Sequence, residues 1–249
     1  MIYLKTPKEI ESMKRASNIV AIILQEMTER VASGISTWDI DQFAEKRCAD
    51  FKVVPAFKGY RNFPACVCIS INNEVVHGIP SKKRILKDGD IVGLDFGVIW
   101  EGWYGDSAKT VGVGKIAPET QKLLSVSEKS LNLGIEECRA GNKLYDIGAA
   151  VQGHAESFGY TVVREFVGHG IGRSLHEDPQ VPNFGTKGKG PLIKVGMVLA
   201  IEPMVNQGRP DVRVLNDGWT AVTLDGALSA HFEHTVAVTE AGPVILSLP

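Results

Sequence analysis

Cysteine is scarce in this sequence, and the cysteines that are present form no recognisable pattern. Four cysteines among 249 residues are too few for a disulfide scaffold. Cys66 and Cys68 are separated by one residue, but no second pair follows to complete a zinc ribbon. We therefore expect reduced thiols and a cytoplasmic location.

The sequence also lacks an excess of positive charge and any long apolar run. Its 27 Lys and Arg stand against 29 Asp and Glu, whereas binding to a phosphate backbone favours a basic balance. No apolar run approaches the roughly 20 residues of a membrane span, and the first ten residues lead into a charged segment without a signal-peptide core. We expect a globular protein with no direct nucleic-acid substrate and no membrane partner.

Several familiar catalytic motifs are missing. The sequence contains no P-loop, no HExxH zinc helix and no GxSxG nucleophile elbow. Gly168, Gly170 and Gly172 form a glycine-rich stretch, but Arg173 stands where a dinucleotide fingerprint requires its last glycine. A nucleotide site is therefore disfavoured, and these glycines instead allow the backbone to approach closely around His169.

Two helices are predicted at the start of the chain. Thr6-Pro7-Lys8-Glu9 is typical of a helix start, because Thr can cap, Pro suits the first helical position and Glu can complete a capping box. Apolar residues keep helical spacing over 10–31, and Gly34 is expected to end this helix. A second helix is predicted from Ser36 or Thr37 to about residue 51.

The same order returns 107 positions later. The segment 34–40 shares Gly, aromatic, Asp and Ile with the segment 141–147, and the turn-and-strand pattern 86–95 matches 193–202. A Lys-x-Gly turn before an apolar run is also common at the start of any strand, so a single match carries little weight. Two matches at one offset predict a duplicated α+β architecture, in which each half packs its helices on one face of a sheet. We expect the halves to meet between Lys115 and Pro118.

Four carboxylates lie in or beside apolar strand patterns, where an acid is costly to bury unless a positive group meets it. They are Asp95, Asp106, Glu202 and Glu233. Residues 100–105 suit a hairpin connection, which would bring Asp95 and Asp106 together. Glu202 is the counterpart of Asp95 in the repeat, so a pseudo-two-fold axis would bring acids from both halves to one centre. His169 adds a nitrogen donor to this set.

Counting charges favours two metal ions at this centre. Four carboxylates around one divalent ion would leave an excess of negative charge, whereas two ions neutralise the cluster. Paired ions activate water for hydrolysis, and a site of oxygen ligands with one imidazole suits Mn, Fe, Co or Zn. Taken singly, each acid would more often cap a turn or pair with Lys or Arg. His77 and His176 alone would be structural histidines, and His231 and His234 are expected to flank a ligand rather than bind it.

Nine ordered motifs across nearly the whole chain resemble the type I methionine aminopeptidases. These motifs are Lys5-Thr6-Pro7, Cys68-Ile69-Ser70-Ile71-Asn72, Val76-His77-Gly78-Ile79-Pro80, Lys87-Asp88-Gly89-Asp90-Ile91-Val92, Tyr104-Gly105-Asp106, Gly168-His169-Gly170-Ile171-Gly172, His176-Glu177, Ile201-Glu202-Pro203-Met204 and Phe232-Glu233-His234-Thr235. The segment between Glu202 and Glu233 is too short for the helical insertion of type II enzymes. The resemblance implies the pita-bread fold, a pseudo-symmetric α+β duplication with an antiparallel sheet and helices on its outer face.

The resemblance further implies a metallo-exopeptidase that removes the N-terminal methionine of nascent proteins and peptides with a small second residue. One catalytic domain would span 1–249, with halves of about 1–115 and 116–249. Two divalent ions (Co, Mn, Fe, Zn or Ni) would activate the hydroxide that attacks the first peptide bond. The implied metal ligands are Asp95, Asp106, His169, Glu202 and Glu233, with Asp106 and Glu233 bridging the ions.

The resemblance also assigns substrate contacts. It implies that His77 lies near the scissile amide, that His176 stabilises the tetrahedral intermediate and that Glu202 shuttles the proton of the attacking water. An apolar pocket would hold the methionine side chain, since aromatic and sulfur groups suit a thioether. Its residues would be Tyr60, Phe63, Cys68 and Trp219, with Phe57 and Leu175 nearby.

The expected partners are polypeptide N-termini, with transient contact to the ribosome, and we expect a monomer. Two other functions stay open on the sequence. A proline-specific aminopeptidase or dipeptidase shares the fold, and fold alone does not separate these activities. A non-catalytic binding module of the same fold would be expected to have lost ligands, whereas all five ligand types are present.

Overall fold

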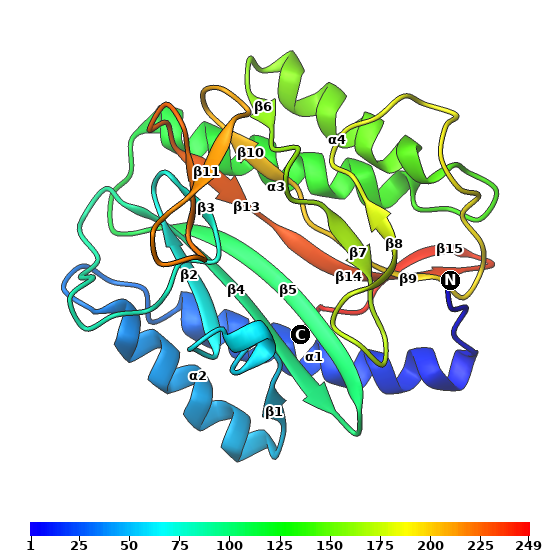
Figure 1. Cartoon of the computed structure of the whole chain (residues 1–249), viewed down its shortest axis with the longest axis horizontal. Coiled ribbons are helices and arrows are strands. Elements are labelled where there is room, and N and C mark those ends of the chain that lie inside the picture. The colour runs from blue at the N-terminus through cyan, green and yellow to red at the C-terminus, as the bar shows by residue number, and fades with distance from the viewer.

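Strands from both ends of the sequence form one antiparallel sheet at the centre of the computed structural model, which describes all 249 residues (Figure 1). The order of the strands is β1-β4-β5-β14-β9-β7-β8, with β2 beside β4 and β15 beside β14. Their bounds are β1 Val54–Pro55, β2 Val67–Ile71, β4 Ile91–Trp100, β5 Trp103–Gly112, β7 Gly168–Gly170, β8 Glu177–Val181, β9 Val198–Ile201, β14 Glu233–Thr239 and β15 Gly242–Ile245.

Two small sheets lie beside the central one. The first has the order β13-β10-β6 and the second β11-β12-β3. Their bounds are β3 Glu74–Val76, β6 Thr161–Val162, β10 Met204–Asn206, β11 Val212–Val214, β12 Ala221–Thr223 and β13 Ser229–His231. A single 3-10 turn, η1 (Tyr60–Asn62), precedes β2.

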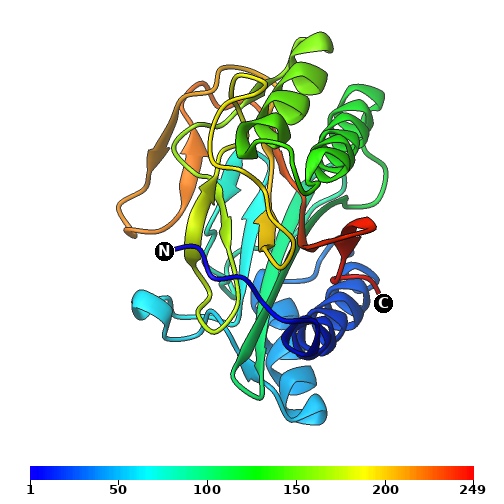
Figure 2. The same ribbon diagram turned by 90° about the vertical axis from the view of Figure 1, so that its right-hand side faces the viewer.

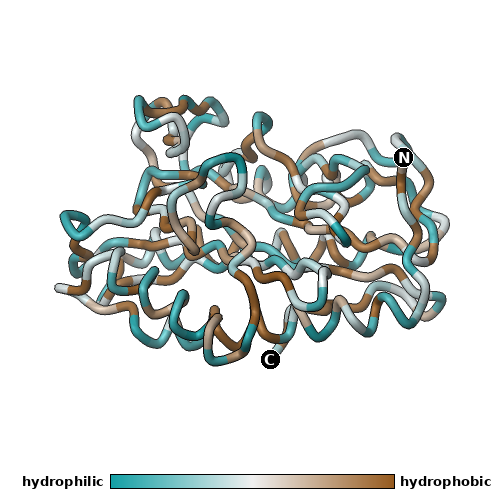
Figure 3. The backbone as a smooth tube through the Cα atoms, turned by 60° about the horizontal axis from the view of Figure 1, so that its bottom comes forward, coloured by the Kyte–Doolittle hydropathy of each residue, from teal (hydrophilic) through white to brown (hydrophobic).

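Four helices gather on one side of the central sheet (Figure 2). They are α1 Pro7–Thr28, α2 Thr37–Phe51, α3 Pro118–Glu137 and α4 Leu144–Ser157. α1 packs on β4 and β5, and α3 packs on α4. The helices alternate hydrophilic and hydrophobic residues along their turns (Figure 3), as expected for helices that bury one face. None of them combines the length and the apolar character that crossing a bilayer requires.

The predicted start of α1 is confirmed, and its predicted end is wrong. The Thr6 side chain accepts from the backbone N–H of Glu9, and the Glu9 carboxylate accepts from the N–H of Thr6, which completes the capping box. The helix ends at Thr28 rather than at Gly34. Val31 packs against the core from the following loop, so the apolar spacing continues beyond the last helical turn. The second helix begins and ends as predicted.

The duplication is confirmed down to single hydrogen bonds. The N–H of Gly34 donates to the carbonyl oxygen of Leu86, and 107 residues later Gly141 donates to Ile193. The isolated bridge between Ser36 and Ile85 has the same counterpart in the bridge between Lys143 and Leu192. In each half, the segment before the second helix is thus joined to the segment before β4 or β9 by the same hydrogen bonds.

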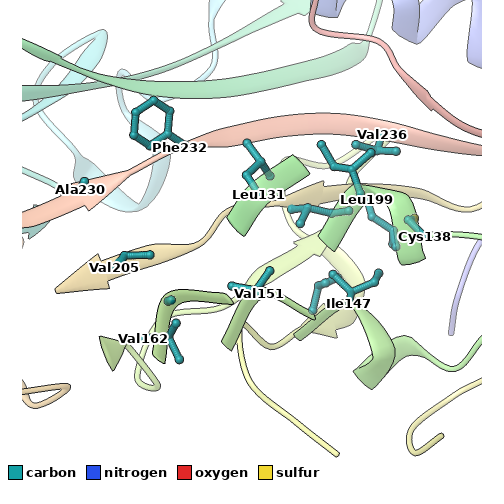
Figure 4. Packing of buried hydrophobic residues seen from close by; sticks show 14 of the residues in the cluster. Leu131, Cys138, Ile147, Val151, Val162, Leu199, Val205, Ala230, Phe232 and Val236 are labelled. Atoms are coloured by element: carbon teal, nitrogen blue, oxygen red, sulfur yellow. The ribbon is translucent and has the colours of Figure 1, made fainter. Parts of the chain in front are cut away.

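Each half also has its own apolar core between its helices and the sheet. A cluster of 17 buried residues lies under α1 and α2, and a cluster of 23 lies under α3 and α4. In the second cluster Leu131, Ile147 and Val151 from the helices meet Leu199 and Val236 from the sheet (Figure 4). The helices therefore cover one face of the central sheet and not the other.

Candidate active site

One pocket takes residues from both halves of the chain. Its lining consists of Phe57, Tyr60, Arg61, Phe63, Cys68, His77, Asp95, Asp106, His169, Leu175, His176, Glu202, Trp219 and Glu233. Every site residue predicted from the sequence is in this list, and only Arg61 was not predicted. The structure therefore brings the predicted residues together, and their individual roles stay a prediction.

Strand register places three of the acids close together. The turn at Glu101-Gly102 joins β4 to β5, as predicted, and the register sets Asp95 opposite Ala108. Ala108 also lies opposite Glu233 on the other side of β5. Asp95 and Glu233 are thus in one row across three strands. Asp106 precedes Ala108 by two residues, so its side chain points to the same face of the sheet.

The acids and one imidazole converge at the base of the pocket. Single ligand atoms of Asp106, His169 and Glu233 all lie within 4.8 Å of one another, and all three residues are buried. Glu202 joins them, because its Oε1 lies 3.4 Å from His169 Nε2. Asp106 Oδ1 and Glu233 Oε1 are buried and have no hydrogen-bond partner.

Hydrogen bonds fix the backbone at Asp106 and Glu233 and the ring of His169. The Thr235 hydroxyl donates to the carbonyl oxygen of Asp106 at 2.7 Å, and the Ser107 hydroxyl donates to that of Glu233 at the same distance. His169 Nδ1 lies 2.9 Å from the carbonyl oxygen of Gly170. Because a carbonyl only accepts, Nδ1 carries the proton and Nε2 presents its lone pair to the acids.

The pKa values of the acids are raised in this environment. Burial raises the pKa of Asp95 to about 7, with a further contribution from the nearby Glu202. Burial also raises the pKa of Glu202 to about 8. The pKa of Asp106 and that of Glu233 are well above the usual range, because of burial and then of the neighbouring carboxylates. Burial lowers the pKa of His169 to about 3, so its imidazole is neutral.

These residues fit divalent cations. Two buried carboxylate oxygens lack a partner, the Nε2 lone pair of the neutral His169 ring lies 3.4 Å from Glu202 Oε1, and the ion pairs of these acids involve only histidine. Without a positive charge, ionising these buried and mutually repelling carboxylates is energetically costly. Oxygen ligands with one imidazole nitrogen are a set that binds Mn, Fe, Co or Zn.

The other wall of the pocket is apolar and aromatic. The rings of Phe63 and Trp219 meet edge to face with centroids 5.1 Å apart, and the His77 ring meets the Trp219 ring at 6.1 Å. Cys68 on β2 lies opposite Asp95 on β4 and is buried. This wall offers an apolar side chain the aromatic and sulfur contacts that suit a thioether.

Two further histidines line the pocket. His77 has φ of +62°, a conformation that costs energy for a residue other than glycine. A Cβ on the following Gly78 would lie 2.1 Å from the carbonyl oxygen of Ile69, so only glycine lets the chain pass there. His176 Nδ1 lies 2.8 Å from the hydroxyl of Tyr60, and the His176 ring lies 4.2 Å from that of His169.

Sequence reasoning did not predict that Arg61 lines the pocket or that His231 lies beside Glu202. Arg61 has φ of +47° within η1, and no sequence signal marks this conformation. His231 Nε2 is buried without a hydrogen-bond partner, 3.6 Å from Glu202 Oε2. The expectation that His231 flanks a ligand rather than binding it stays a prediction. His231 ends β13 and Glu233 begins β14, so no alternation within one strand marks this contact in the sequence.

The glycine-rich stretch serves close packing around His169. A Cβ on Gly168 would lie 2.3 Å from the carbonyl oxygen of Ala200, and one on Gly170 would lie 2.1 Å from that of Asp178. Neither position tolerates a side chain without moving the strand that carries His169. This explains the pattern without any nucleotide.

Comparisons with known proteins agree with this geometry. The metallopeptidase family M24 matches residues 11–240. A methionine aminopeptidase of Clostridium acetobutylicum is 48% identical over 248 residues, which cover 100% of this chain and 99% of that protein. The crystal structure of a methionine aminopeptidase from Thermotoga maritima superposes with a TM-score of 0.98 at 45% identity, with 100% of both chains covered.

A more distant match supports the fold alone. The prolidase of Pyrococcus furiosus has a TM-score of 0.78 at 21% identity, and the match covers 99% of this chain and 65% of the prolidase. The duplicated sheet, the buried acids and the full-length relatives lead to one conclusion. The chain belongs to metallopeptidase family M24.

Proposed function

We propose that this protein removes the N-terminal methionine from peptides and nascent proteins whose second residue is small. A single catalytic domain of residues 1–249 performs the hydrolysis. The observation that carries the proposal is one pocket in which an apolar wall with Phe63, Cys68 and Trp219 faces a cluster of buried acids. The methionine side chain lies against the wall, with its first peptide bond above the acids. Full-length relatives named methionine aminopeptidase support this assignment.

The residues that would hold two divalent ions are the four acids and His169. The support for them is the pair of unpartnered carboxylate oxygens and the lone pair of His169 Nε2. Such ions supply a Lewis acid and a strongly nucleophilic water at neutral pH. The ions are Co, Mn, Fe, Zn or Ni.

Three residues act on the substrate in this proposal. Glu202, ionised as a metal ligand, accepts the proton of the attacking water and passes it to the leaving amine. His176 donates a hydrogen bond to the oxygen of the tetrahedral intermediate. His77 lies beside Trp219 and holds the scissile amide.

Tyr60 supports the role of His176. When its hydroxyl donates to Nδ1 over 2.8 Å, the proton of the neutral His176 ring is on Nε2. Burial, and then the charge of Arg61, lower the pKa of His176, so the ring is neutral before the reaction. The free N–H is then available to the developing negative charge.

The proposal includes a cytoplasmic monomer that contacts the ribosome transiently and acts on emerging chains. All four cysteines are free and buried, which suits a reducing compartment. Analytical ultracentrifugation of the purified protein tests the monomer, and co-sedimentation with ribosomes tests the contact.

A peptide panel tests the proposed reaction. Purified protein loaded with Mn²⁺ or Co²⁺ is incubated with Met-Ala-Ser, Met-Leu-Ser, Leu-Ala-Ser and Leu-Pro. We expect methionine to be released from Met-Ala-Ser, with much slower cleavage of the other peptides. The Asp106→Asn variant is the matched control and should be inactive. Cleavage of Leu-Pro with Met-Ala-Ser left intact would replace this proposal with a proline-specific activity.

A further inference from the structure

Two acids beside His176 have no role in the proposed reaction, and each contacts the N-terminal segment, residues 1–6. This segment runs across the loop of residues 171–176, which we call the His176 loop (Figure 2). Lys5 Nζ donates to Glu177 Oε2 at 2.7 Å, and the Lys5 side chain is only 1% exposed. The backbone N–H of Lys5 donates to the carbonyl oxygen of Gly196 at 2.7 Å. Lys5 is therefore fixed at both its backbone and its ammonium group.

The Glu177 carboxylate connects Lys5 to the loop. Its second oxygen accepts from the backbone N–H groups of Arg173 at 2.7 Å and Ser174 at 3.1 Å. A Cβ on Gly172 would lie 2.6 Å from that oxygen and 2.7 Å from Lys5 Cε. The glycine thus leaves the space that the ion pair occupies. One partly buried carboxylate binds the Lys5 ammonium through one oxygen and the loop backbone through the other.

The opposite side of the loop is held by the β4–β5 hairpin. The guanidinium of Arg173 stacks over the Trp103 ring at 3.7 Å and donates to the carbonyl oxygen of Glu101 at 3.1 Å. The N–H of Tyr104 donates to the carbonyl oxygen of Gly172 at 2.9 Å. The loop between these two anchors carries His176 into the pocket.

Stability alone gives little reason for this pair, in which the Lys5 side chain is buried and the Glu177 side chain is 17% exposed. Well-packed apolar residues in place of a buried ion pair often leave a protein as stable or more stable. The Glu177 carboxylate accepts hydrogen bonds from two backbone N–H groups of the loop, and an apolar side chain could not do this. The neighbouring pair between the Met1 ammonium and Asp178 has both groups exposed, so it contributes little.

We propose that Lys5 and Glu177 are positioning residues that hold the His176 loop in the conformation in which His176 reaches the scissile bond. This inference rests on the proposed function, because it assigns a use to the placement of His176. The two residues do not touch the substrate. They act by restricting the backbone that carries the imidazole.

The variant Lys5→Met tests this inference, because methionine fills the same buried space without the charge. Lys8→Met removes an exposed lysine three residues away and is the matched control. With Met-Ala-Ser as substrate we expect kcat of Lys5→Met to fall about 10-fold to 100-fold, since small misplacements of a catalytic group cost that much. KM should change less than about twofold, and the metal content should equal that of the wild type.

Amide hydrogen exchange provides a readout that does not depend on activity. In Lys5→Met the amides of Arg173 and Ser174 should exchange at least about tenfold faster, while those of β4 and β5 keep their protection. Wild-type kcat together with unchanged exchange at these two amides would overturn the inference. If the wild type releases no methionine, the proposed function fails, and the exchange data still decide whether the pair holds the loop.

A double variant keeps the test decisive if the single variant does not fold. Lys5→Met/Glu177→Gln contains no unpaired buried charge, so the usual cause of misfolding is removed. We expect the same loss of kcat, because a neutral amide binds the two loop N–H groups more weakly than a carboxylate does. The control Asp178→Asn changes the adjacent exposed acid and should keep the wild-type kcat. A double variant with wild-type kcat would refute the role of the pair.

Discussion

Stabilisation by a divalent cation should grow as the pH rises from 6.5 to 8. In the metal-free protein the pKa of Asp95 is raised to about 7 and that of Glu202 to about 8. In the unfolded chain both carboxyls ionise near pH 4. Above pH 4 the metal-free fold therefore binds more protons than the unfolded chain, and its stability falls with rising pH until the pH passes these pKa values. A cation requires ionised ligands, so the loaded protein does not suffer this loss.

The size of the effect follows from the two pKa values. Each fully retained proton lowers the stability of the metal-free protein by about 1.4 kcal/mol per pH unit. Glu202 keeps most of its proton over this interval and Asp95 loses its proton early, so together they contribute about 2 kcal/mol. The pKa values of Asp106 and Glu233 are also raised, and these groups act in the same direction. For a chain of this length, about 2 kcal/mol corresponds to about 4–8 °C in Tm.

Thermal unfolding followed by circular dichroism measures this difference. Protein with excess Mn²⁺ and protein with EDTA are compared at each pH. Groups remote from the acids contribute equally in both forms and cancel in the comparison. The difference in Tm between the Mn²⁺-loaded and the EDTA-treated protein should be about 4–8 °C larger at pH 8 than at pH 6.5. An equal gap at both pH values, or a narrower gap at pH 8, would contradict the cluster of buried protonated acids.

Three further predictions concern single residues. His176→Ala should lower kcat by about 10²–10³-fold with normal metal content, because it removes the proposed donor to the intermediate; a lost metal ion, measured by elemental analysis, would mean that His176 is a ligand. Asp106→Asn should abolish methionine release and lower the metal stoichiometry seen by calorimetry, and retained turnover would rule out a bridging role. Leu199→Ala removes a side chain buried in the second core and should cost about 2–5 kcal/mol in denaturant unfolding; a cost below about 1 kcal/mol would show that the cluster rearranges around the gap.

Much of the fold was predictable because the two halves repeat local signals. Gly34 and Gly141 have φ of +91° and +96°, a conformation that favours glycine, and this is why the residue type recurs in the sequence. The capping box at Thr6 likewise leaves a short pattern. The end of α1 was not predictable from apolar spacing, because Val31 serves the same core from a loop. Hydrophobic spacing reports burial and does not report where helical hydrogen bonding stops.

The site was predictable where a residue type is rare in its setting. An acid such as Asp95 within an apolar strand stands out because its burial is costly. Arg61 does not stand out, since charged residues in loops are ordinary, and Glu177 appeared only as part of the motif with His176. Their positions depend on a left-handed backbone at Arg61 and on contacts across 172 residues of sequence between Glu177 and Lys5. Long-range pairings of this kind leave no local signal.

The division of the acids between the two copies has a consequence for inheritance and for engineering. The first copy supplies Asp95 and Asp106, and the second supplies His169, Glu202 and Glu233, which meet through the pairing of β5 with β14. An ancestor with one copy would have needed to dimerise before it could assemble such a centre. For the same reason, mutations that loosen the pairing of β5 with β14 would separate the acids of the two copies.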